Sequence, residues 1–197
     1  LRPKLYFALA NQSLLIADSI AKYYSINLKS GELNWLKNGS YSFNSEIKKE
    51  NNKFFIVDYK NTLRSFSVDD GTELWNFQTE DSFAISDTKN SLIVVGDLVI
   101  FSNSIGDITA INIETGLITW QLPTQSSDII NESYNFKTSR LVSDGKSIYF
   151  EQDDNEIYSD QYMHAYWKKD LDSIERTKSR YAIPMIKNPL EIGLNAI

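Results

Sequence analysis

The chain has 197 residues, of which 20 are basic and 26 acidic, giving a formal net charge of −6 at pH 7. Its composition is 42% hydrophobic and 13% aromatic, which allows a sizeable core and argues against intrinsic disorder. No basic stripe is present to track phosphates, so a nucleic-acid partner is not expected. The absence of cysteine excludes disulfides, Cys-ligated zinc and thiol nucleophiles, and no apolar run reaches the roughly 18 residues that a transmembrane helix needs.

The first element predicted along the chain is a strand at Ser13–Ser19, followed by an alternating strand that passes through Ile26 to Leu28. Two polar residues and Gly31 come next. They predict a tight hairpin turn, because glycine adopts the positive φ that other side chains resist. The chain then returns as a further strand, with Trp35 four residues after the glycine. This order predicts antiparallel strands joined by short turns.

The same order recurs twice further along the chain. Gly71 precedes Trp75 by four residues, as Gly116 precedes Trp120, and the three tryptophans lie 40 and then 45 residues apart. Further strand candidates accompany these units: Glu46–Glu50, Lys53–Tyr59, Ser91–Asp97 and Leu98–Ser104. Four short antiparallel strands that repeat every 40–45 residues or so are typical of a β-propeller blade.

The fixed distance from turn to tryptophan has a mechanical consequence. Because side chains alternate along a strand, every indole is directed to the same face of its sheet, where it can cover the neighbouring unit. A slip of one residue would turn the indole to the opposite face. We therefore predict that one set of structural repeat residues packs adjacent blades together: Gly31, Trp35, Gly71, Trp75, Gly116 and Trp120.

A fourth unit begins at Thr138–Ser159 with two strand candidates and then departs from the pattern. Trp167 lies 47 residues after Trp120, but Met163 occupies the glycine position. We expect residues 1–160 to form the repeats and residues 161–197 to form an irregular or partly helical tail that begins a further blade near its end. The expected blades lie near residues 13–37, 46–79, 91–123 and 138–159.

The pattern of an alternating strand followed by a polar pair, glycine and a tryptophan four residues later resembles the PQQ-like, or quinoprotein-like, β-propeller repeat. That family includes quinoprotein dehydrogenases and BamB-like outer-membrane assembly proteins. The resemblance implies an all-β fold with blades of four antiparallel strands, three of them clear and a fourth partial. Complete propellers of the family have more blades than this chain can hold, so we expect an incomplete propeller.

The resemblance allows both an enzyme and a scaffold. Quinoprotein dehydrogenases hold a metal ion with carboxylate and amide ligands and use an aspartate base, and no position here carries that motif. The acidic cluster at Asp153, Asp154 and Glu156 lacks the spacing of a calcium loop, and His164 is the only histidine. We therefore predict no catalytic, cofactor-binding or metal-binding residue and favour a non-catalytic scaffold. A fragment of a PQQ-dependent dehydrogenase is the alternative.

Protein partners are the expected ligands of such a scaffold, because propellers present their loops at two faces. Aromatic and apolar residues between the predicted blades would be the anchors. The candidate protein-binding residues are Tyr41, Phe43, Phe83, Ile129 and Tyr134. The competing interpretation is that these side chains close the packing between blades.

The resemblance implies a bacterial envelope or periplasmic location. The segment from Leu1 lacks the order of regions found in a signal peptide. Because the first residue is Leu rather than Met, we expect a processed or trimmed chain, or a fragment. A peripheral membrane tether would then lie upstream. Asn-x-Ser sequons at Asn11, Asn38 and Asn131 leave open a eukaryotic luminal stress-sensor domain, whose β-rich repeats look similar.

Overall fold

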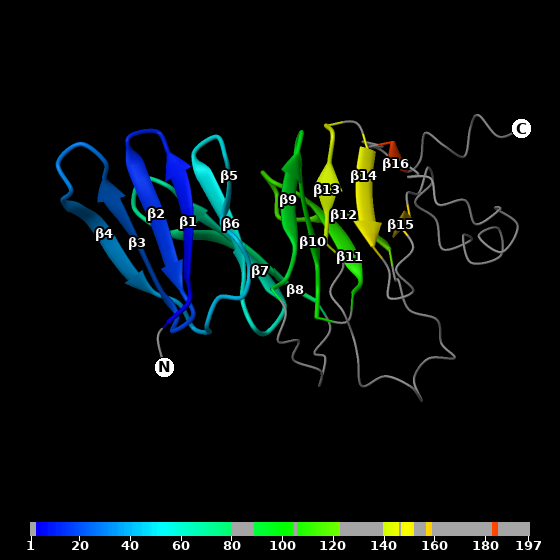
Figure 1. Cartoon of the computed structure of the whole chain (residues 1–197), viewed down its shortest axis with the longest axis horizontal. Coiled ribbons are helices and arrows are strands. Elements are labelled where there is room, and N and C mark those ends of the chain that lie inside the picture. Colours follow the sequence, from blue (N-terminus) through cyan, green and yellow to red (C-terminus); the bar gives the residue numbers. More distant parts are fainter. Residues whose placement is uncertain are drawn as a thin grey trace, which may run out of the picture.

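A computed structural model of the chain describes residues 3–79, 89–104, 106–122, 140–145, 147–151, 157–158 and 183–184. The secondary structure of these residues consists of strands without a helix, and they form four sheets of four strands each. The sheets stand side by side in a row that does not close on itself (Figure 1). Within this part of the chain no helix is long and apolar enough to cross a membrane.

Each of the first three sheets is a meander of consecutive antiparallel strands. The first sheet comprises β1 (Leu5–Ala10), β2 (Ser13–Asp18), β3 (Lys22–Asn27) and β4 (Leu33–Asn38). The second comprises β5 (Lys48–Glu50), β6 (Lys53–Val57), β7 (Thr62–Ser67) and β8 (Glu73–Gln78). The third comprises β9 (Leu92–Val95), β10 (Leu98–Ser102), β11 (Ile108–Asn112) and β12 (Ile118–Leu122).

The fourth sheet is built differently. Its strands β13 (Val142–Ser143), β14 (Ser147–Glu151) and β15 (Ile157–Tyr158) follow the meander, and β16 (Ile183–Pro184) joins the sheet by pairing with β14. Residues 161–197 were expected to form a tail, and one short strand from this segment, β16, therefore belongs to the fourth sheet. The remainder of residues 161–197, with His164 and Trp167, lies outside the described residues, and so does the acidic cluster of Asp153, Asp154 and Glu156.

The predicted all-β fold with four-stranded antiparallel blades in an open arc is confirmed. The first sheet contains one strand that the sequence did not lead us to expect, β1, which pairs with β2 along its whole length from Leu5 to Ala10. The predicted blade boundaries left this strand out, since they placed the first blade near residues 13–37.

The repeated hairpin turn joins the third and fourth strands of each of the first three sheets. Gly31, Gly71 and Gly116 have φ values of 74°, 71° and 69°, in the left-handed region where a side chain is strained. In each turn the glycine N–H donates to the carbonyl four residues earlier, with N···O distances of 2.8–3.0 Å. In the first and third turns an asparagine, Asn27 or Asn112, also accepts two backbone N–H groups through its Oδ1.

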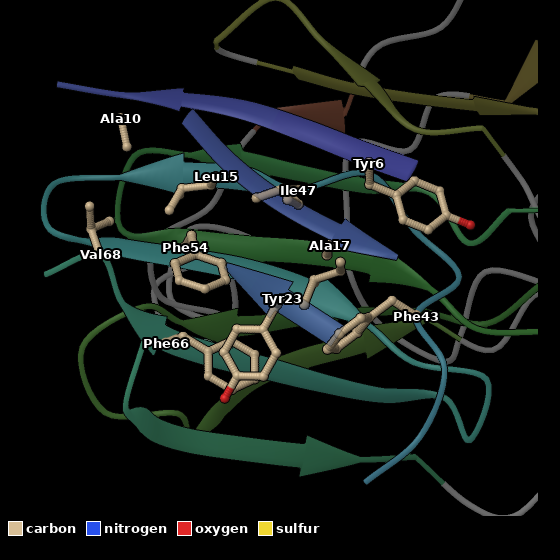
Figure 2. Packing of buried hydrophobic residues seen from close by; sticks show 11 residues of the cluster. Tyr6, Ala10, Leu15, Ala17, Tyr23, Phe43, Ile47, Phe54, Phe66 and Val68 are labelled. Carbon is tan, nitrogen blue, oxygen red and sulfur yellow. The ribbon is translucent and has the colours of Figure 1, made fainter. Parts of the chain in front are cut away.

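Three apolar layers lie between successive sheets. The first layer contains side chains of β1–β3 that meet β6 and β7, with the rings of Tyr23, Phe54 and Phe66 close together (Figure 2). A second layer joins the second and third sheets around Phe55 and Phe101, which are both 0% exposed. The third joins the third and fourth sheets. The core therefore sits between the blades, as the direction of the indoles requires.

A second recurring turn links the second and third strands of each of the first three sheets and is held by a buried acceptor. Asp58, which is 0% exposed, accepts the backbone N–H groups of Lys60 and Thr62 through Oδ1, at 2.8 and 3.1 Å. Its Oδ2 accepts the Nε–H of Arg64 at 2.9 Å. At the repeat-equivalent position of the third sheet, Asn103 accepts a backbone N–H through its Oδ1. The second and third sheets therefore both have a side-chain oxygen that accepts backbone N–H groups at this turn, whereas the ion pair with Arg64 occurs in the second sheet.

We expect Asp58→Asn to lower the free energy of unfolding by about 2 kcal/mol, because the new amide N–H₂ faces the Arg64 guanidinium and leaves that charge without its buried partner. The double variant Asp58→Asn/Arg64→Thr reproduces the residues of the third sheet, Asn103 and Thr109, and should recover about half of the loss. Urea unfolding of the three chains checks this. Additive losses in the double variant would contradict the pairing.

Candidate functional site

The indole of Trp35 fills a site on the second sheet. Its Nε1–H donates to the carbonyl of Val68 at 3.0 Å, and the ring lies against Gly71 so closely that a Cβ there would be 2.7 Å from it. We call this arrangement an indole site. It consists of a turn glycine, against which the indole ring lies, and the backbone carbonyl three residues before that glycine, which accepts the indole N–H. Because glycine alone leaves room for the ring, the turn residue of one blade is matched to the tryptophan of the preceding blade.

The next seam repeats this geometry. Trp75 Nε1–H donates to the carbonyl of Ile113 at 3.1 Å, and a Cβ on Gly116 would be 2.8 Å from the ring. Trp120 is 7% exposed and packs with Leu141, Ile148 and Phe150 of the fourth unit. Among the described residues its buried Nε1–H has no hydrogen-bond partner.

Aromatic contacts surround the first indole site. Tyr23 lies edge-on to Trp35, with ring centroids 5.8 Å apart, and its hydroxyl donates to the carbonyl of Gly71 at 3.2 Å. Burial raises the pKa of Tyr23, and the nearby Glu73 carboxylate adds to the effect, so the phenol stays a neutral donor at physiological pH. The site is therefore an apolar seam closed by neutral hydrogen bonds.

A buried polar cluster fastens the second sheet to the third. The side-chain Oδ1 of Asn61 accepts from the backbone N–H and the hydroxyl of Ser104, at 2.9 and 2.7 Å, and from Nδ2 of Asn90 at 3.1 Å. All three residues are at most 3% exposed. The sequence analysis did not find this cluster, because its members belong to two repeats and to no shared motif.

The candidate protein-binding residues have different positions. Tyr41 is 47% exposed, and Nζ of Lys60 lies 6.0 Å from the centre of its ring. Phe43 is 0% exposed and packs against Tyr23, so its side chain lies in the seam between the first and second sheets rather than on the surface. Phe83, Ile129 and Tyr134 lie outside the described residues. Of the five candidates, the structure therefore places one on the surface.

The exposed turn of the second sheet carries a perturbed carboxylate. The hydroxyl and backbone N–H of Thr72 donate to Asp70, at 2.5 and 3.0 Å, and lower the pKa of that carboxyl from 3.8 to about 2. A carboxylate with a depressed pKa contributes stability that is present above its unfolded value and is lost as the pH falls through the folded value.

We expect the acid limb of the stability profile to be shallower in Asp70→Asn than in the native chain, because the amide has no charge to lose between about pH 4 and pH 2. Urea midpoints measured across that range, with an NMR titration of the Asp70 carboxyl carbon, check the expectation. Parallel acid limbs in the two chains, or a folded pKa near 3.8, would contradict it.

Within the described residues, no group of three or more His, Asp or Glu side chains is placed to hold a metal ion. Gly71, Gly116 and the three repeat tryptophans contact neighbouring sheets, and the Asp58–Arg64 ion pair stabilises a turn. What this part of the chain offers chemically is thus a stack of sheets with exposed loops.

Comparison with known proteins identifies the repeat. The family model described as outer membrane protein assembly factor BamB, which is built of PQQ-type repeats, matches residues 3–174. The chain belongs to the BamB family. No curated protein sequence matches it.

Solved structures share the fold of this BamB-family chain. BamB from Moraxella catarrhalis is 14% identical with a TM-score of 0.58, over 75% of this chain and 45% of that one. The computationally designed Ika4 protein is 12% identical with a TM-score of 0.60, over 81% and 91%. A europium-containing methanol dehydrogenase is 17% identical with a TM-score of 0.54, over 64% and 26%. This BamB-family chain thus spans less than half of the BamB structure that it matches.

Proposed function

We propose that this chain is part of a non-catalytic β-propeller scaffold that binds protein partners in the bacterial envelope during outer-membrane protein assembly. The observation that carries the proposal is the match of the BamB family model over residues 3–174. The periplasmic location, and a peripheral tether upstream, are proposed on the same ground.

The proposal is supported by the structural role of the repeat tryptophans, which pack one sheet against the next. Trp35 and Trp75, the residues that an enzyme could offer to a flat cofactor, are bonded to the next sheet at Val68 and Ile113. The loops between sheets are then the parts available to a partner. Tyr41 lies in such a loop, between β4 and β5, and combines an apolar ring with a polar tip, as interface anchors do.

Binding of the chain to purified β-barrel assembly machinery from a Gram-negative bacterium tests the proposal. We expect saturable binding that Tyr41→Ala weakens about tenfold, the effect of losing one anchor worth about 1.4 kcal/mol. Leu74→Ala is the matched control, since Leu74 on β8 is also 47% exposed but lies outside the loop. Absence of saturable binding would overturn the proposed function, and equal binding by both variants would remove Tyr41 from it.

A quinoprotein dehydrogenase fragment is the second candidate, favoured by the fold that the chain shares with the methanol dehydrogenase. The two candidates differ in a direct measurement. If pyrroloquinoline quinone and calcium are added to the chain, the scaffold proposal predicts no bound-cofactor spectrum and no dye-linked alcohol oxidation. A clear signal in both would favour the enzyme.

A further inference from the structure

The strands run between two ends of the molecule that differ in charge. We call one the turn end, where the first and third turns of each meander lie, and the other the loop end, where the chain passes from one sheet to the next (Figure 1). The turn end is acidic. Among the residues that the structure describes in its turns, the exposed charged ones are six acids and one base: Glu32, Asp69, Asp70, Asp97, Glu114, Asp144 and Lys29.

The loop end has the opposite charge. Outside the strands, its described segments carry four exposed bases against one exposed acid. That acid, Glu46, already forms an ion pair with Lys48 of β5 at 3.1 Å, so it leaves the charge of the four bases in place. The chain as a whole has a net charge of −6, which makes the positive charge a local property of this end. The four bases are Lys4, Lys60, Lys89 and Arg140.

Several of these charges lie on backbone segments that are bonded to one another. Each segment leads into the first strand of a sheet, and the first strands of successive sheets are neighbours. The N–H of Asn90 donates to the carbonyl of Asn44 at 2.8 Å, and the N–H of Leu141 donates to the hydroxyl of Ser91 at 2.8 Å. The entries of the second, third and fourth sheets are thereby joined. We call the charged residues that they carry the entry cluster: Glu46, Lys48, Lys89 and Arg140.

The charges of the entry cluster act on its one carboxyl group. The pKa of Glu46 is lowered, first by the hydrogen bond and the charge of Lys48, and to a smaller degree by the charges of Lys89 and Arg140. Among the described residues, neither Lys89 nor Arg140 forms an ion pair of its own. Nζ of Lys89 lies 5.2 Å from the centre of the Tyr6 ring. These two cations are therefore held near one acid and remain open to an acid from outside.

We propose that the loop end binds an acidic segment of a protein partner, whose carboxylates pair with Lys89 and Arg140. The proposal rests on the proposed scaffold function and adds the chemistry of the partner. A guanidinium can hold a carboxylate through two parallel N–H groups, and an ammonium adds a point charge beside it. Tyr41 and Lys60 lie at the same end, with Nζ 6.0 Å from the ring centre, and offer the segment an apolar and a further cationic contact.

Charge also determines how such a segment is oriented. The carboxylates of the turn end repel it, whereas the bases of the loop end attract it, so encounters that lead to binding occur at the loop end. A long polyanion such as a nucleic acid fits less well. Its phosphates need a stripe of bases to follow, whereas the described bases are gathered at one end of an acidic chain.

Binding of a labelled acidic peptide tests the proposal. We expect a fluorescein-labelled peptide of alternating glutamate and alanine to bind about tenfold more tightly than the same peptide with glutamine in place of glutamate. Fluorescence anisotropy at about 50 mM salt measures both, and the difference should shrink as the salt concentration rises. Equal binding of the two peptides, or tighter binding of an oligothymidylate of matched charge, would overturn the proposal.

Four variants locate the peptide on the chain. Lys89→Glu and Arg140→Glu should each weaken binding of the glutamate peptide about fivefold. Glu46→Gln should tighten it about twofold, because Lys48 loses its partner, and a gain cannot come from unfolding. Lys29→Glu is the matched control, since it makes the same change of charge at the turn end and should leave binding unchanged. Equal losses in Lys29→Glu and Lys89→Glu would contradict a site at the loop end.

The same variants separate this proposal from the scaffold function on which it rests. We expect Lys89→Glu and Arg140→Glu, but not Lys29→Glu, to weaken binding to purified β-barrel assembly machinery about fivefold. If the native chain binds the machinery and all three variants bind equally well, the acidic partner segment is wrong and the scaffold function stands. If the native chain binds the glutamate peptide but not the machinery, the scaffold function is wrong and the basic site stands.

Discussion

Replacing Trp75 with alanine is expected to lower the free energy of unfolding by about 4 kcal/mol, within the range found for deleting a large aromatic side chain from a core. The indole lies between the second and third sheets, against Phe55 and Gly116, and its N–H donates to Ile113. Its removal opens a cavity in the seam and leaves the Ile113 carbonyl without this donor. Both losses fall on the contact that joins one blade to the next.

Urea unfolding followed by circular dichroism measures this loss, and two further variants separate its causes. Trp75→Phe keeps much of the ring and loses the N–H donor, so it should cost about 1–2 kcal/mol. Leu74→Ala removes the adjacent, 47% exposed side chain on β8 and should stay within about 0.5 kcal/mol of the native chain. A cost for Trp75→Ala no larger than that for Leu74→Ala would show that the indole does not hold the seam.

Gly71→Ala is expected to destabilise the chain by about 3 kcal/mol. An L side chain at a φ of +71° costs about 1 kcal/mol, and the new Cβ would lie 2.7 Å from the Trp35 ring, an overlap that forces the sheets apart. The substitution adds a single methyl group. Its cost therefore reports the closeness of indole and backbone rather than any change of polarity.

Gly31→Ala is the matched control for this effect. Gly31 occupies the equivalent turn of the first sheet with a φ of +74°, but nothing lies within 4 Å of a Cβ added there. The alanine should therefore cost only the backbone strain of the positive φ, about 1 kcal/mol. Unfolding in urea gives both values in one experiment. Equal costs for the two alanines would mean that Trp35 does not occupy the site that Gly71 provides.

The repeated hairpins were predictable because their signals are local. The left-handed turn requires glycine, and the alternation from Ile26 to Leu28 indicates a half-buried strand without knowledge of its neighbours. The strand β1 was missed for the complementary reason. Its residues from Leu5 to Ala10 are apolar on both sides of the strand and show no alternation, although one side faces the core and the other, with Phe7 and Leu9, is exposed.

Features that join different repeats could not be predicted. Phe43 stands in a polar stretch that resembles a surface loop, yet it is buried because the chain brings it against Tyr23 of β3. The cluster of Asn61, Asn90 and Ser104 likewise depends on how the second and third sheets dock. Sequence spacing predicted which way the indoles point, and three-dimensional packing determines which polar groups meet them.

The central claim is that Trp35 and Trp75 are fixed, each by one hydrogen bond of the indole N–H, to the turn of the following blade. Hydrogen exchange of the Trp35 and Trp75 indole N–H groups, followed by NMR, tests it most directly, because these protons donate to Val68 and Ile113. The account predicts that both exchange slowly, with protection that falls only as the sheets separate in denaturant. Exchange of either proton at the rate of a free indole would contradict the account.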